Sequence, residues 1–577
     1  MVAPSAQRRR HKARSIYFAS DSPSASFLHN FLTAIAISLP HTAGIQFPEH
    51  RETDMPAQAL RFTFLAKVVA ALLLVLAADW LFADFLIGSW LGGLALAWVV
   101  ALALVKPSVR HGPALVALLC AAGFALALIY QPGLLAWGMF WSALSIATLL
   151  PRIVGFDDAW RWAIRLLAHG LSGPAMPMAD LGRLLRKKSA HGRPTIRSTA
   201  AILALPVLMS ALFVTLFARA NPLIEELFAS IRLPSLGEVI FWLLALAIIW
   251  PSLRPGRFAT RIVGQLPETE VTLPGASLPS VLISLVIFNV VFAVENSLDL
   301  IFLWSGAPLP AGVSLAEYAH RGAYPLIGTA LLAGIFVLTT MKPGSATAAS
   351  PAIRKLVVLW IVQNLLLVAS SILRTCDYIE VYMLTGWRIA ALAWMGLVAL
   401  GLALICWRML TGRSARWLIN SNALVAAILL SVATIVDFDA IAAGWNVNHA
   451  REVGGRGGPL DLCQLNGMGT SALLPLIALE QRRSLNAGFR ERVTFVRHEI
   501  LVRADDQLDW RSWNWLDSWR RQRALALLGK HPRVPKIMNR GCGGELVDDS
   551  PPSPATQPSP APTPSTSTPA LTRAPAA

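Results

Sequence analysis

About eleven apolar runs of roughly 17 to 25 residues constrain this chain more than any other feature of its sequence. A helix of that length crosses a hydrocarbon core of about 30 Å. Lipid offers no partner to an unpaired backbone group, so each run must be helical. Only 14% of the 577 residues are charged, whereas a soluble domain would carry about a quarter. The sequence therefore predicts an all-α, polytopic bundle of transmembrane helices, with no room between runs for a soluble catalytic domain of ordinary size.

The expected membrane spans follow from where each apolar run begins and ends. They cover residues 64–83, 85–105, 114–130, 134–150, 199–217, 235–252, 279–304, 323–340, 355–374, 389–407 and 417–436. Asp84 and its neighbours alone separate the first two runs. These two runs therefore form either a tight hairpin or a pair in which one helix does not cross.

Lysine and arginine are distributed unevenly between the two sets of loops. With the N-terminus in the cytoplasm, the inner loops hold 27 of them and the outer loops five, and the positive-inside rule favours that orientation. Eleven spans then put the C-terminal region on the outer side, although one missed or false span would reverse this. Because the net charge of +17 is spread over short loops, we expect membrane lipids as partners and no nucleic acid.

The chain divides by composition into four parts. Residues 1–54 are basic and are predicted to be a disordered extension, or to precede a true start at Met55; residues 55–436 form the multi-span membrane domain. Residues 437–548 are predicted to be a soluble or interfacial helical segment, in which tryptophans 510 to 519 alternate with arginines as at lipid headgroups. Residues 549–577, rich in Pro, Ser, Thr and Ala, are predicted to be a disordered tail.

A further amphipathic stretch lies in the longest inner loop, at residues 157–171. It carries Trp, Ile and Leu on one helical face and Arg on the other. This pattern favours a helix lying on the cytoplasmic leaflet over a helix that docks a partner protein.

Four segments in the second half of the chain carry a family resemblance. They read LAEYAHRGAYPLIGTALLAGIFVL (315–338), QNLLLVASSILR (363–374), LTGWRIAALAWMGLVALGL (384–402) and NVNHAREVGGRGGPLDLCQLNGMG (446–469). Over roughly residues 280–480 the chain resembles the bacterial membrane family called Domain of Unknown Function 4173. The resemblance implies a bacterial inner-membrane protein, for which the loop charges predict a cytoplasmic N-terminus and eleven spans predict a periplasmic C-terminus. It implies no activity.

Ionisable residues inside a span are costly, at about 2.5–3.5 kcal/mol each, and so require a reason. Glu295 and Asp299 lie four residues apart on one helical face, towards the outer end of their span. Other charged residues occupy the outer loops, and together they form a candidate vestibule. Its members are Glu295, Asp299, Glu317, His320, Arg321, Arg374, Asp377, Arg388, His449 and Arg451.

The vestibule has two readings. In the first, it binds a polar small molecule or a lipid headgroup, or moves protons. In the second, it is a ring of solvated loop charges with structural ion pairs. Asn289, Gln363 and Asn364 fall near the middle of their spans. For these three amides we favour hydrogen bonding between helices.

No GxSxG, HExxH or EF-hand pattern is found in the sequence. The segment GGRGG at 454–458 lacks the spacing of a phosphate loop, and we predict that it is a flexible joint. We expect no cofactor and no metal. The sequence favours a non-enzymatic binding, transport or envelope-support component. The alternative is an outer-leaflet membrane enzyme that modifies a lipid-linked substrate with acids such as Glu317 and a base such as His320.

Five cysteines complete the sequence-level predictions. Cys120 and Cys406 lie in apolar runs and are expected to serve packing. Cys376, Cys463 and Cys542 fall on the predicted outer side. We favour three free thiols there, with a Cys376–Cys463 bridge as the alternative, because sequence cannot show which Cα atoms approach within about 7 Å.

Overall fold

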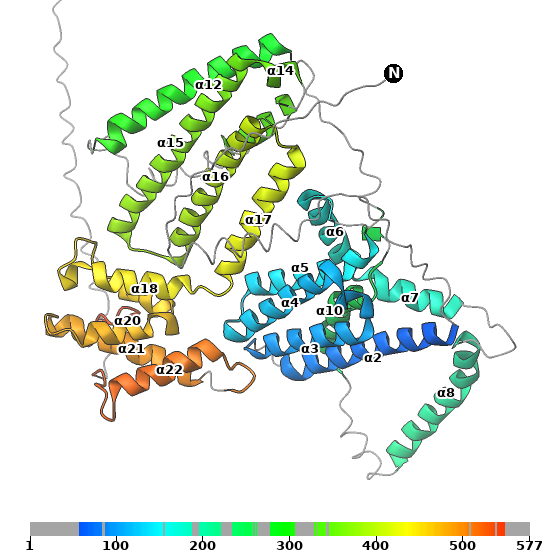
Figure 1. Cartoon of the computed structure of the whole chain (residues 1–577). Coiled ribbons are helices and arrows are strands. Elements are labelled where there is room, and N and C mark those ends of the chain that lie inside the picture. Colours follow the sequence, from blue (N-terminus) through cyan, green and yellow to red (C-terminus); the bar gives the residue numbers. More distant parts are fainter. Residues whose placement is uncertain are drawn as a thin grey trace, which may run out of the picture. The chain divides into compact units, whose positions relative to one another are not determined.

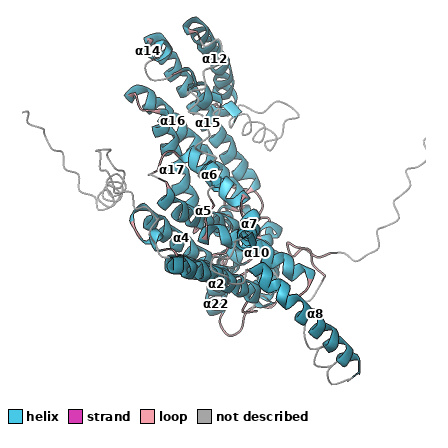
Figure 2. Ribbon diagram, turned by 90° about the vertical axis from the view of Figure 1, so that its right-hand side faces the viewer, coloured by secondary structure: helices cyan, strands magenta, loops and turns pink. Residues whose placement is uncertain are grey.

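A computed structural model describes most of the chain. The described residues are 57–82, 87–153, 156–186, 196–220, 234–256, 258–259, 261, 277–305, 328–329, 332–337, 339–341, 345–506, 509–536 and 539–547. Within them every regular element is a helix, apart from an isolated bridge between Arg540 and Leu546, as Figures 1 and 2 show. The predicted all-α class is confirmed. The extension 1–54 and the tail 549–577 lie outside the described residues.

Eight helices in this part of the chain are long and apolar enough to cross a membrane, which confirms the multi-span prediction. They are α2 (Ala57–Phe82), α4 (Gly112–Tyr130), α5 (Leu134–Leu149), α10 (Leu236–Leu253), α12 (Leu278–Asp299), α15 (Pro351–Tyr382), α16 (Gly386–Thr411) and α17 (Ala415–Ala433). Each corresponds to one predicted run.

The other three predicted spans differ from these eight. Helix α3 (Trp90–Val105) has 16 residues, because a turn at Gly88 and Ser89 occupies the start of the predicted run. The apolar stretch 201–217 lies within α8 (Ile196–Ala220) and also falls short of the length of the eight. The run at 323–340 lies partly outside the described residues.

Helices α2 to α5 and α10 share one hydrophobic core, in which small residues allow close helix packing. Ala95, Ala121 and Ala125 are fully buried. A Cβ on Gly92 of α3 would lie 2.5 Å from the carbonyl oxygen of Ala125 on α4, so only glycine fits there. A second core joins α12, α15 and α16, with the rings of Phe288, Phe336 and Trp360 at its centre.

The amphipathic stretch in the long loop after α5 forms α6 (Ala159–Leu171), which is followed by α7 (Ala175–Arg186). The carboxylate of Asp158 caps the N-terminus of α6, and one face buries Trp162, Arg165 and His169. The opposite side leaves apolar residues such as Leu171 exposed. This division agrees with the amphipathic pattern, and the membrane contact of α6 stays a prediction.

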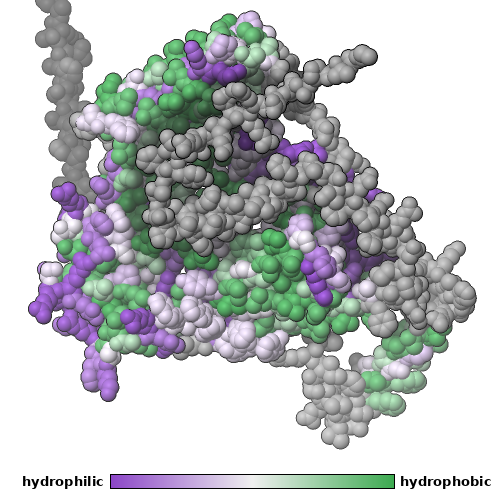
Figure 3. Space-filling model, in the orientation of Figure 1, coloured by the Kyte–Doolittle hydropathy of each residue, from purple (hydrophilic) through white to green (hydrophobic). Residues whose placement is uncertain are grey.

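After the last membrane helix, five α-helices in the described part of the chain form a third core. They are α18 (Phe438–His449), α19 (Leu462–Gly467), α20 (Thr470–Glu480), α21 (Ala487–Asp506) and α22 (Trp515–Leu528). Hydrophilic residues gather on their surface, whereas hydrophobic residues cover much of α12 (Figure 3). In this core, Arg497 of α21 is 1% exposed and pairs with Glu480 of α20 at 2.8 Å. The carboxylate also accepts a hydrogen bond from Thr494, so the buried charges are well partnered.

The tryptophan-rich stretch is only partly helical. Asn514 caps α22, which starts at Trp515, so Trp510 and Trp513 precede the helix. Leu516, Arg520 and Ala524 are buried within the C-terminal helices, while Trp519 is half exposed. One face of this helix therefore belongs to a protein core and is unavailable to lipid headgroups.

Candidate functional site

Helices α12 and α15 are joined by a row of polar contacts, which we call the polar seam. The amide nitrogen of Asn289 donates to the carbonyl oxygen of Leu356 at 3.1 Å, and that of Asn296 donates to the carbonyl oxygen of Gln363 at 3.3 Å. From the first of these hydrogen bonds to the second, the position advances by seven residues on α12 and by seven on α15. The two helices therefore run parallel and in register. The interhelical hydrogen bond expected of Asn289 is thus present. Asn364 instead donates to a carbonyl of its own helix.

The polar seam leaves several oxygen atoms without a partner among the described residues. They are the side-chain oxygens of Asn289, Asn296, Gln363 and Asn364, and one carboxylate oxygen of Asp299. Unsatisfied buried acceptors cost about 1–3 kcal/mol each, and a functional role is one of the reasons for which proteins retain them.

An ion pair between Asp299 of α12 and Arg374 of α15 lies at the end of the polar seam. Asp299 is 4% exposed, whereas Glu295, four residues earlier, is exposed. Positions four apart differ by about 40° around a helix axis. The face that meets α15 therefore holds Asn296 and Asp299 and leaves Glu295 at its edge. The structure thus separates the two acids that the sequence analysis grouped.

Arg388, another predicted vestibule residue, holds the turn between α15 and α16. Its guanidinium donates to the carbonyl oxygens of Tyr382 (2.5 Å) and Met383, and lies 4.3 Å from the ring centroid of Tyr378. Met383 adopts a φ of 68°, in the left-handed region that a side chain rarely occupies. Arg388 therefore partners the carbonyl groups that α15 leaves unpaired at its end.

The GGRGG segment packs tightly against the ends of two helices, so the prediction of a flexible joint is wrong. The N–H groups of Gly457 and Gly458 donate to the carbonyl oxygens of His449 and Glu380, respectively. A Cβ on Gly455 would lie only 2.2 Å from the carbonyl oxygen of His449. Glycine is therefore required because neighbouring backbone leaves no space for a side chain.

His449 and Arg451 lie at this packed segment. The His449 ring stacks on Trp445, with centroids 4.1 Å apart, and both His449 and Arg451 are exposed. Asp377 is half-buried near the end of α15. Glu317, His320 and Arg321 lie outside the described residues. Among the described members of the predicted vestibule, the structure thus brings Asp299 and Arg374 into direct contact as an ion pair.

Two acids at the start of α18 have opposite tendencies to ionise. Burial raises the pKa of Asp437, but the Ala440 N–H, Arg520 and the Ser471 hydroxyl outweigh it and hold the pKa below its usual value. Burial, reinforced by the charge of Asp437, raises the pKa of Asp439. The carboxylate of Asp437 thereby links α18 to Ser471 of α20 and Arg520 of α22, which is a structural use of its charge.

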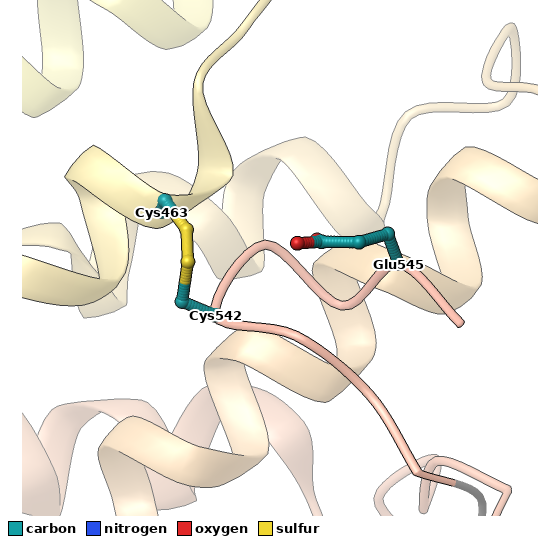
Figure 4. A group of neighbouring side chains, drawn as sticks. All are labelled: Cys463, Cys542 and Glu545. Carbon is teal, nitrogen blue, oxygen red and sulfur yellow. A yellow bond between two sulfur atoms is a disulfide. The ribbon is translucent and has the colours of Figure 1, made fainter. Parts of the chain in front are cut away.

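A disulfide joins Cys463 of α19 to Cys542, with Cα atoms 4.9 Å apart (Figure 4). The sequence analysis expected either three free thiols or a Cys376–Cys463 bridge, and neither agrees with this pair. Cys376 is free and exposed. The Glu545 carboxylate points towards the bridge, with an oxygen within 4.8 Å of both sulfur atoms. Sulfur atoms bonded to each other offer no thiolate to a metal ion. The bridge instead fixes the segment 539–547 against α19 and α21, where Arg492 also donates to the carbonyl oxygen of Gly543.

A family model matches residues 94–479 of the chain, about two thirds of its length. The chain belongs to the family described as Domain of unknown function (DUF4153). The DUF4153 region runs from α3 to α20 and includes the whole polar seam. The family number predicted from the four segments differs, while the prediction of a family of unassigned function is supported. No curated protein and no solved structure matches the chain.

Sequence reasoning missed the partner of Cys463 and the pairing of Asp299. Both depend on residues 75 or more positions apart. The only sequence-level signal for the pair was the presence of an acid and an arginine near the same predicted end of two spans.

Proposed function

We propose that this DUF4153 protein is a non-enzymatic component of a bacterial inner membrane that binds or transports a polar ligand from the outer side. The observation that carries the proposal is the buried Asp299–Arg374 pair at the end of the polar seam. Ionisable groups within membrane helices are functional candidates by default because their insertion is costly. The unpartnered oxygens along the polar seam add groups that a polar ligand or bound water would satisfy.

Two independent features support an outward position for this pair. Basic residues gather at one end of the membrane helices, for example Arg110 before α4 and Arg413 before α17, which favours the cytoplasm for that end. The Asp299–Arg374 pair lies at the other end, on the side of the C-terminal helices. The Cys463–Cys542 disulfide within those helices favours an oxidising compartment such as the periplasm.

Thiol labelling in intact cells tests whether the site opens outward. Glu295→Cys and Asp299→Cys would be made in a Cys376→Ser background and treated with a membrane-impermeant maleimide. Trp387→Cys, at an 88% exposed position, is the reactive control, and Leu128→Cys, at a fully buried position outside the polar seam, is the protected control. We expect labelling at position 295 and slower labelling at 299. Protection of both positions to the level of Leu128→Cys would contradict an outward site.

Complementation of a deletion strain separates binding or transport from the enzymatic alternative. A transport role predicts altered uptake or export, restored by the wild type but not by Asp299→Asn, with unchanged envelope lipids and glycans. The lipid-modifying alternative predicts changed lipid or glycan composition that His320→Ala or Glu295→Gln fails to restore. That second outcome would overturn the proposal.

A phosphatase fused after residue 547 tests the orientation. The proposed topology predicts an active phosphatase and a silent cytoplasmic reporter at the same position. The reverse result would place the disulfide in a reducing compartment and remove the argument for an outward site.

A further inference from the structure

A cavity of about 490 Å³ lies at the end of the membrane helices opposite to the Asp299–Arg374 pair. It is bounded by the start of α15, the end of α16 and the short helix α14 (Ala346–Ala349). Three arginines line it, namely Arg354, Arg408 and Arg413, and its described lining contains no acidic residue. Arg354 precedes Arg374 on α15 by 20 residues, which corresponds to roughly 30 Å along the helix.

Arg408 is the most informative of the three because it is 4% exposed. Its Nε donates to the carbonyl oxygen of Arg413 at 3.3 Å. Within the described part of the chain it forms no ion pair. Its two terminal nitrogens form no hydrogen bond with a described residue, and they are not sealed from solvent. A buried guanidinium requires compensation for its charge, and the described residues supply only the carbonyl oxygen of Arg413.

Local backbone geometry brings the arginines together. Helix α16 ends at Thr411, and Gly412 adopts a left-handed φ of 66°, which turns the chain back so that the Arg413 N–H donates to the Arg408 carbonyl oxygen. Arg354 donates through its Nε to the carbonyl oxygen of Ala348 at 3.2 Å. Arg354 and Arg408 are thus both anchored through Nε, and among the described residues their terminal nitrogens have no acceptor.

A purely structural reading explains part of this arrangement. Arginines near the inner end of a membrane helix extend to the headgroup region and interact favourably with the helix C-terminus. That reading suits Arg413 and the nearby Arg416, which are exposed. It does not account for a nearly buried Arg408 at a cavity without an acidic lining residue.

We propose that this cavity binds an anionic phosphate group, carried either by a membrane lipid headgroup or by a small soluble phosphate compound. Arginine suits phosphate because its planar fork donates two parallel hydrogen bonds. The cavity is also lined by Val337, Met341 and Leu410, which provide an apolar wall for the uncharged part of an amphiphile. The proposal does not depend on the function proposed for the other end of these helices.

Binding by the full-length protein in nanodiscs tests the proposal with two probes. The first probe is phosphatidylglycerol in a phosphatidylcholine background, measured as lipid retained by native mass spectrometry. The second is inorganic phosphate, titrated by calorimetry into protein in phosphatidylcholine nanodiscs. Retained phosphatidylglycerol that phosphate does not displace identifies a lipid headgroup, and saturable phosphate binding identifies a soluble phosphate compound. Binding of neither probe would overturn the proposal.

Matched variants test whether two of the lining arginines, Arg354 and Arg408, are responsible for binding. We expect Arg354→Gln and Arg408→Gln to weaken binding about tenfold or more, since each removes charge-assisted hydrogen bonds. Arg416→Gln removes an exposed charge at the same end outside the cavity lining and should change binding less than about twofold. An equal loss in all three variants would mean non-specific attraction and would overturn the proposal.

A fourth variant guards against misfolding of the Arg408 variant. Ala348→Phe fills the cavity without removing a charge, at a position that is only half-buried. We expect it to abolish binding while the melting temperature and elution volume remain those of the wild type. Unchanged binding by Ala348→Phe would show that the cavity is not the site.

Discussion

The indole N–H of Trp90 donates to the carbonyl oxygen of Trp510 at 2.7 Å, and the two residues are 420 positions apart. Neighbouring contacts reinforce this link. The Ser89 N–H donates to the carbonyl oxygen of Trp513 at 2.8 Å, and the Trp515 N–H donates to the Ser89 hydroxyl oxygen at 2.9 Å. The turn between α2 and α3 therefore holds the segment that leads into α22.

Gly88→Ala should weaken this attachment. A Cβ at position 88 would lie 2.6 Å from the carbonyl oxygens of both Arg511 and Trp513, and backbone cannot move as cheaply as a side chain. We expect a loss of about 1–3 kcal/mol and faster proteolysis around residues 509–514. Gly93→Ala is the control, because its Cβ would meet only a Trp90 ring atom at 3.7 Å. Equal protease resistance in both variants would contradict the attachment.

Removal of one member of the Asp299–Arg374 pair should be more costly than removal of both. The pair is largely buried, so Asp299→Leu or Arg374→Met alone separates a buried charge from its partner in the pair, at a cost of about 3–5 kcal/mol. The double variant should be more stable than either single variant. Thermal unfolding of the purified variants in detergent measures this coupling, and additive losses would show that the pair contributes no coupling energy.

Reduction of the Cys463–Cys542 disulfide should destabilise the C-terminal helices. The bridge closes a separation of 79 residues, and loss of such a bridge costs about 2–5 kcal/mol. A reducing agent should therefore lower the melting temperature of the wild type and of Cys376→Ser, but not that of Cys463→Ser. If the reducing agent leaves the wild type unchanged, the bridge has no stabilising role.

Acidification should destabilise the packing of α6 through His169. Burial lowers the pKa of His169 to about 4, and the nearby charges of Lys106 and Arg152 act in the same direction. Between pH 6.5 and pH 4 the unfolded state therefore binds more protons than the folded state. Stability must fall as the pH falls through this window. At pH 5 the loss amounts to about 2 kcal/mol.

The His169→Gln variant isolates this contribution from the titration of other groups. Its melting temperature should fall less between pH 7 and pH 5 than that of the wild type. His111→Gln removes an exposed histidine at the start of α4 and should retain the wild-type pH dependence. A parallel decline in wild type and His169→Gln would refute the role of His169.

Sequence periodicity and length were sufficient to predict the membrane helices. Apolar runs such as 114–130 and 134–150 became α4 and α5 with boundaries shifted by at most a few residues. This succeeds because the bilayer fixes the length of a span and leaves a helix as the only way to satisfy its backbone. The prediction was less accurate at α3, where the turn at Gly88 and Ser89 is shaped by contacts with residues 513 and 515.

The sequence by itself thus determined the helical class, the approximate spans and the uneven distribution of basic residues, all of which depend on local composition. Tertiary structure alone decided that Asp299 pairs with Arg374, that Cys463 bonds to Cys542, and that Arg408 is buried at a cavity. It also decided that the glycine-rich segment at 454–458, which was expected to be a flexible joint, packs closely against the ends of α15 and α18. The physical reason is that these features depend on which helix faces meet and how closely. Such contacts arise between residues far apart in the chain, and no local pattern encodes them.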